Sequence, residues 1–136
     1  ARGANADAGA GAGAWIVAVS ALLDAACVIV FAALGRSQHG RVETLAGLWQ
    51  TAWPFLAALA AVWLVARVWR RPTALLSSGL PVWIGTVALG LLLRVLFTDG
   101  GAALPFVLVA AGTLGLALLG WRAIARLIRY LRTPRQ

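Results

Sequence analysis

The chain has 136 residues, and its composition excludes most classes of soluble protein. Hydrophobic residues make up 62% of it and charged residues only 12%, whereas soluble domains carry roughly 25% charged residues. A water-soluble domain of this size cannot bury so much apolar surface. We therefore expect a single-domain integral membrane protein.

The net charge is +8, and all the basic residues behind it are arginines, because the sequence contains no lysine. The arginines flank apolar runs, so we expect them to set membrane orientation and contact anionic lipid, with no role in nucleic-acid binding. One cysteine and one histidine exclude an internal disulfide, a bis-histidine haem and a multi-cysteine or histidine-rich metal site. We expect no cofactor and no metal.

Residues 1–14 form an Ala/Gly-rich N-terminal tail without the basic start and apolar stretch of a signal peptide. Alone, such a segment buries too little surface to offset its ordering entropy, so we expect it to be disordered unless a partner holds it. Four apolar runs follow, each near the length that crosses a bilayer. They predict an all-α bundle of four transmembrane helices at about residues 15–35, 45–68, 80–98 and 103–121.

The first predicted span carries an acid near its middle, Asp24. A carboxylate at this depth is costly, so it should face protein or water and have a partner. The other charge well inside a span is Arg94, whose side chain should lean toward the midplane over the space left by Gly90. We expect an Asp24–Arg94 ion pair; a proton or ion pathway, or no pairing at all, are the alternatives.

The connection between the first two spans is the most polar stretch of the chain. Arg36, His39 and Glu43 are candidate contacts for an outer ligand or a lipid head group, although a solvated connector is the simpler interpretation. No nucleophile or second acid accompanies them in a fixed spacing, so we expect no catalytic site. In the second span Pro54 predicts a kink. Kinks can mark binding sites, but membrane helices tolerate proline readily, so we favour a role in helix packing over ligand binding.

The end of the chain predicts a close helix contact followed by a basic surface. Residues 99–101 are short enough to force an antiparallel hairpin, and Pro105 falls in the first turn of the fourth helix. Gly112, Gly115 and Gly120 favour close helix packing. Residues 122–136 predict a basic amphipathic helix lying on the inner leaflet. This helix and the connection between the second and third spans supply the expected lipid head-group contacts: Arg70, Arg71, Arg122, Arg126, Arg129 and Arg132.

The distribution of arginine predicts the orientation of the bundle. With both termini in the cytoplasm, nine arginines lie on the inner side and three on the outer side. Cytoplasmic segments carry the excess of basic residues, so both termini should be cytoplasmic. Tryptophans near the span ends, Trp83 and Trp121 among them, are expected to anchor at the membrane interface.

The chain resembles the family of bacterial and archaeal membrane proteins called domain of unknown function 3054. The resemblance covers about residues 22–121 and rests on Asp24, Gly35-Arg36 followed by His39, Trp53-Pro54-Phe55, Trp63 and Arg67, and Trp83-x-x-Thr86 with Gly90 and Arg94. It implies a four-helix membrane protein and points to Asp24, Arg36, His39 and Arg94. It implies no mechanism, because the family has no assigned activity.

These observations lead to two main functional hypotheses, ahead of a third, an enzyme that acts on a lipid head group. The first is a non-catalytic accessory or assembly subunit of a larger complex in the bacterial plasma membrane, because chemical groups are few and small-residue helix faces are frequent. The alternative is a small transporter or lipid-binding module that uses Asp24, Arg94 and the His39 loop. Water access to Asp24 would favour the second hypothesis, and a dry, packed ion pair would favour the first.

Overall fold

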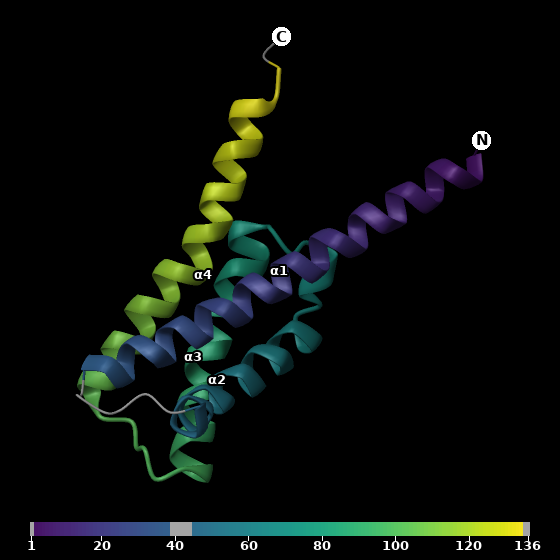
Figure 1. Cartoon of the computed structure of the whole chain (residues 1–136). Helices are drawn as coiled ribbons and strands as arrows, with labels where there is room; N and C mark the ends of the chain where they lie inside the picture. The colour runs from purple at the N-terminus through teal and green to yellow at the C-terminus, as the bar shows by residue number, and fades with distance from the viewer. Residues whose placement is uncertain (1, 39–44, 135–136) are drawn as a thin grey trace.

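The computed structural model describes residues 2–38 and 45–134, and over these ranges it contains helices and no strands. Side chains are described for residues 11–35 and 45–134. The four long helices are α1 (Arg2–Gln38), α2 (Leu45–Val65), α3 (Leu80–Phe97) and α4 (Leu104–Arg132) (Figure 1). All four are long and apolar enough to cross a membrane, which confirms the predicted all-α architecture.

The helices form a bundle in which α1 and α3 each pack against both α2 and α4. The start of α1 and the end of α4 lie at the same end of the bundle (Figure 1). A short non-helical segment, residues 98–103, joins α3 to α4 as the predicted hairpin. Pro105 lies in the first turn of α4, also as predicted, where its missing N–H breaks no helical hydrogen bond.

The connection between α2 and α3 is more ordered than the sequence predicts. The turn that follows α2 includes Arg67, a non-glycine residue in the left-handed region with φ of 52°. A 3₁₀ turn, η1 (Val68–Arg70), follows, and then a π-helical turn, η2 (Leu75–Gly79), which leads directly into α3. Pro72 and Ser78 are buried, so the connection packs against the bundle and contributes to its interior.

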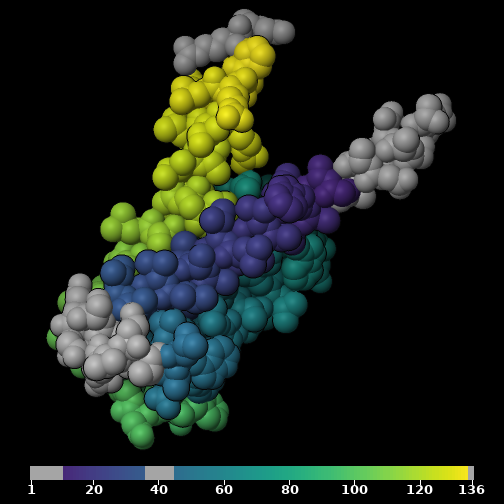
Figure 2. Space-filling model, in the orientation of Figure 1, coloured from purple at the N-terminus to yellow at the C-terminus, as the bar shows by residue number. Residues whose placement is uncertain are grey.

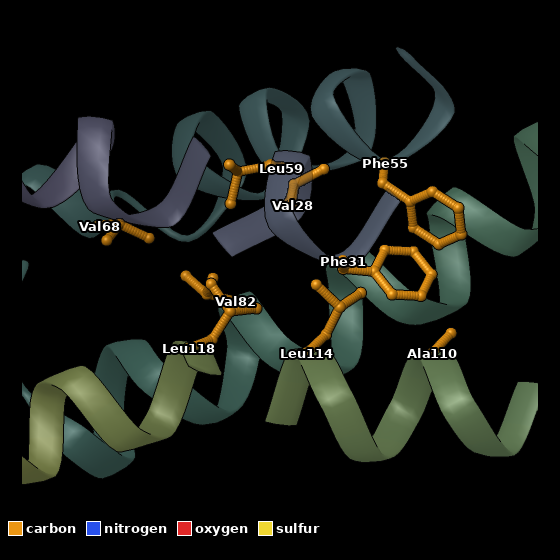
Figure 3. Packing of buried hydrophobic residues seen from close by; sticks show 9 residues of the cluster. All are labelled: Val28, Phe31, Phe55, Leu59, Val68, Val82, Ala110, Leu114 and Leu118. Carbon is orange, nitrogen blue, oxygen red and sulfur yellow. The ribbon is translucent and has the colours of Figure 1, made fainter. Parts of the chain in front are cut away.

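A cluster of buried hydrophobic side chains lies between the four helices (Figure 3). At one end the rings of Phe31 and Phe55 meet edge to face, with centroids 5.2 Å apart. Close approach of α3 to α2 depends on Gly90, where an added Cβ would overlap the Phe55 ring. We predicted that Gly90 makes room for Arg94; that prediction is wrong, because Phe55 fills the space.

Both end segments differ from the sequence prediction. Helix α1 begins at Arg2, so the expected disorder of residues 1–14 is wrong over 2–14. Alanine has the highest helix propensity, and extending an existing helix avoids the cost of nucleation. Helix α4 runs unbroken to Arg132, and its last turns project from the body of the molecule (Figure 2). The predicted basic amphipathic extension is thus present, but it continues the axis of the fourth span, whereas the sequence predicted that it lies on the inner leaflet.

Candidate functional site

The most polar group of side chains in the interior surrounds Asp24. Asp24 lies in α1 on a buried stripe with Ser20 and Val28, and its exposed fraction is 0%. Its carboxylate is bound by the guanidinium of Arg122 from α4, which is also 0% exposed. Arg122 Nη1 donates to Oδ1 at 2.8 Å and Nη2 donates to Oδ2 at 2.7 Å. This bidentate geometry is the strongest form of an arginine–carboxylate contact.

Two tryptophans complete the coordination of the carboxylate. Trp63 in α2 donates its indole N–H to Oδ2 of Asp24 at 2.9 Å, and Trp121 in α4 donates to Oδ1 at 2.8 Å. Each carboxylate oxygen thus accepts two hydrogen bonds, which is the capacity of its lone pairs. Neither tryptophan was predicted as a ligand of the acid, and Trp121 turns inward, whereas the sequence predicted an interfacial anchor.

Arg122 joins this site to the connection between α2 and α3. Its Nε donates to the carbonyl of Pro72 at 3.0 Å, and Nη1 also donates to the carbonyl of Leu118 at 3.1 Å. The guanidinium carbon lies 4.4 Å from the centre of the Trp121 ring, within range of a cation–π contact. The Asp24–Arg122 network therefore links α1, α2, α4 and the segment before η2.

The predicted Asp24–Arg94 pair is wrong. Arg94 lies in the last turn of α3, and its Nε donates to the carbonyl of Gly101 in the following turn at 2.9 Å. Its guanidinium carbon also lies 4.1 Å from the centre of the Phe106 ring. The side chain is thus directed toward the α3–α4 turn, away from the midplane, and both carboxylate oxygens of Asp24 are occupied by other donors.

The predicted lipid contacts separate into two groups. The prediction that Arg122 contacts a lipid head group is wrong, because α4 continues past the expected end of the span and places this side chain in the interior. The side chains of the other five arginines in this prediction are exposed: Arg70, Arg71, Arg126, Arg129 and Arg132. Their contact with lipid stays a prediction.

The residues predicted for the outer loop are largely outside the described part of the chain. His39 and Glu43 lie outside the described residues, and Arg36 lies in α1 with a side chain that is not described. Over residues 11–35 and 45–134, whose side chains are described, no three His, Cys, Asp or Glu side chains gather in a way that could hold a metal ion. The site that the structure does describe is therefore the Asp24–Arg122 network.

This network fixes helices in place. Burying two charges is costly, and the mutual attraction offsets that cost only when geometry and additional hydrogen bonds are favourable. Here the carboxylate has four donors, and the guanidinium also binds two backbone carbonyls. Both charged side chains have 0% exposure, so neither of them faces the surface of the bundle. Such an arrangement specifies which helix faces meet.

Loss of either indole donor should weaken the site measurably. Trp63→Phe and Trp121→Phe each keep an aromatic ring but remove one hydrogen bond to a charged acceptor, and such bonds contribute about 1.5–3 kcal/mol. We expect each variant to unfold at a lower temperature in detergent, followed by circular dichroism. Trp49→Phe is the control, because Trp49 is 62% exposed. An unchanged midpoint in both site variants would contradict the assigned hydrogen bonds.

The four apolar helices and the closed interior site define a multi-pass helical membrane protein. The sequence profile of the family described as "Protein of unknown function (DUF3054)" matches residues 21–125. The chain belongs to this family, and the matched region includes Asp24, Trp63, Trp121 and Arg122. No curated protein and no solved structure matches the chain.

Proposed function

We propose that the protein is a non-catalytic assembly subunit of a larger complex in a bacterial plasma membrane, with both termini on the cytoplasmic side. The observation that carries this proposal is a difference among the glycines of α4. Glycines in membrane helices mark faces where another helix approaches closely. Some of these faces are filled within the chain, and others are open.

The contrast is clearest between Gly115 and its neighbours on α4. An added Cβ at Gly115 would lie 2.9 Å from the indole nitrogen of Trp83, so this glycine is used by the packing of α3. An added Cβ at Gly112 or Gly120 would meet nothing within 4 Å. Leu116, between these two glycines, is 80% exposed. This face of α4 has the composition of a helix contact but no partner among the described residues, which favours a second protein.

The Asp24–Arg122 network supports a structural role. A transporter that used Asp24 would need water or substrate to reach the carboxylate, and its exposed fraction is 0%. The same holds for an enzyme that used Asp24 as acid or base, because all four lone pairs accept hydrogen bonds. The orientation in this proposal is supported by the excess of arginine at the end of the bundle where α4 ends.

Co-purification in mild detergent tests the proposal. We expect the native full-length protein to elute with a second membrane protein, and native mass spectrometry gives the composition of that complex. Gly112→Leu and Gly120→Leu should each reduce the recovered partner about tenfold, since a bulky side chain separates the helices. The control is Ala88→Leu, which places the same new side chain at an exposed position on α3.

Two results would overturn this function. One is a native protein that elutes as a lone monomer in every mild detergent tested. The other is recovery of the partner by both glycine variants at the level of the Ala88→Leu control. A thermal unfolding curve for each variant separates lost assembly from lost folding.

A further inference from the structure

An open groove lies between the start of η2 and the last part of α4. Its volume is about 340 Å³. One wall is the segment before and within η2, and the other wall is basic. The residues that line it are Thr73, Ala74, Leu75, Leu76, Ser77, Arg126 and Arg129. Two cations and two hydroxyl side chains thus line one concave surface, and no acid is among the lining residues.

The two arginines are placed by the helix. Arg126 and Arg129 are three residues apart on α4, so their side chains emerge on the same side. Arg129 is also held in position, because its Nη2 donates to Oγ1 of Thr73 across the groove at 2.9 Å. One helical turn before Arg126 is Arg122, whose Nε binds the carbonyl of Pro72 and fixes the opposite wall relative to α4. The groove is therefore bounded by segments that are bound to each other.

We propose that this groove binds a phosphate group. Guanidinium groups present forked N–H donors that match phosphate oxygens, and two of them supply the charge that a dianion needs. The hydroxyls of Thr73 and Ser77 add neutral donors at the same surface. The proposal does not depend on the assembly function, because the open glycines of α4 are not part of the groove.

The phosphate can belong to a lipid or be free in solution. Leu75 and Leu76 lie beside the arginines in the groove, and Leu76 is 65% exposed, which suits an acyl chain next to a head group. The candidate membrane span formed by η2 and α3 begins at Leu75, so the groove lies at the end of a span, where we expect the polar head groups. Free inorganic phosphate would use the same arginines and hydroxyls without the leucines.

A defined groove and a general basic surface predict different mutational patterns. Arg132 lies on the same helix, is exposed and does not line the groove. If anionic lipid is attracted only by overall charge, Arg126, Arg129 and Arg132 contribute alike. If the groove is a site, the first two contribute and the third does not. This makes Arg132→Gln a control of equal charge change.

The experiment uses the full-length protein in phosphatidylcholine nanodiscs with increasing phosphatidic acid, with binding followed by native mass spectrometry. We expect saturation at one phosphatidic acid per chain. Arg126→Gln and Arg129→Gln should each weaken binding about tenfold, the size of one lost charge-assisted hydrogen bond. Arg132→Gln should change it less than about twofold. Thermal unfolding of each variant shows that the bundle is retained.

A second arm identifies the source of the phosphate. Inorganic phosphate is titrated against the protein in a neutral detergent, and then as a competitor of phosphatidic acid. Binding of inorganic phosphate that is lost in Arg126→Gln assigns the groove to a free phosphate, whereas lipid binding without competition assigns it to a head group. Absence of saturable binding of both probes, or an equal loss in Arg132→Gln, overturns the proposal.

Discussion

Asp24→Asn is expected to destabilise the bundle by about 3–5 kcal/mol, the cost of leaving one member of a buried ion pair without its partner. The substitution keeps the size of the side chain but removes its negative charge. Arg122 then remains 0% exposed with an uncompensated positive charge. Arg122→Gln should be similarly destabilising, because it leaves the carboxylate of Asp24 with only the two indole donors. Unfolding in detergent, monitored by circular dichroism, measures both effects.

A double variant separates the cost of an unpaired charge from the value of the pair. Asp24→Leu combined with Arg122→Met removes both charges, and replacement of a buried pair by apolar residues is often neutral or stabilising. We expect it to be more stable than either single variant, so that the two effects are strongly non-additive. Arg132→Gln, an exposed arginine on the same helix, should change stability by less than about 0.5 kcal/mol. Additive losses would show that Asp24 and Arg122 act independently.

Gly90→Leu should be the most disruptive substitution of a glycine in the core. Even a Cβ at this position would overlap the Phe55 ring. Phe55 has 0% exposure and contacts the rings of Phe31 and Phe106, so it has no space into which to move. Overpacking of this kind costs about 1–3 kcal/mol. The expected result is a lower unfolding midpoint in detergent together with weaker packing of α2 against α3.

The matched control for this prediction is Gly112→Leu. The side chain added there meets nothing within 4 Å of its Cβ in the chain itself, so the isolated protein should keep its stability. Equal destabilisation by the two substitutions would mean that loss of glycine, and not contact with Phe55, is responsible. The same Gly112→Leu variant is expected to lose the assembly partner, so at this position a loss of assembly is expected without a loss of stability.

The fold follows from hydropathy to within a few residues at most helix ends. Four runs of apolar residues predict four spans, and α2 and α3 begin at the predicted residues. The segments at the two ends of the chain were the exception. Hydropathy indicates the point where a span becomes polar, but it carries no information on whether the backbone continues as one helix. Helix α4 therefore extends well past the predicted end of the span.

The early predicted end of the fourth span explains why the sequence does not identify Arg122 as the partner of Asp24. Counting Arg122 with the exposed arginines placed it outside the membrane, and Arg94 was then the one cation left inside a span. Helical spacing places Arg122 on one face of α4 with Ala110, Leu114 and Leu118, since these residues recur every four positions. The structure shows that this face is buried. The two indole donors could not be identified from one sequence, since tryptophans near span ends are typically interfacial anchors.

The Asp24–Arg122 pair also has a consequence for biogenesis. The two residues are 98 positions apart, one in the first span and one at the end of the last. Because the chain is synthesised from its N-terminus, α1 enters the bilayer before its counter-ion exists. A carboxylate at mid-span costs about 2.5–3.5 kcal/mol on insertion scales. An unfinished chain thus carries an uncompensated acid, and insertion of α4 is the step that neutralises it.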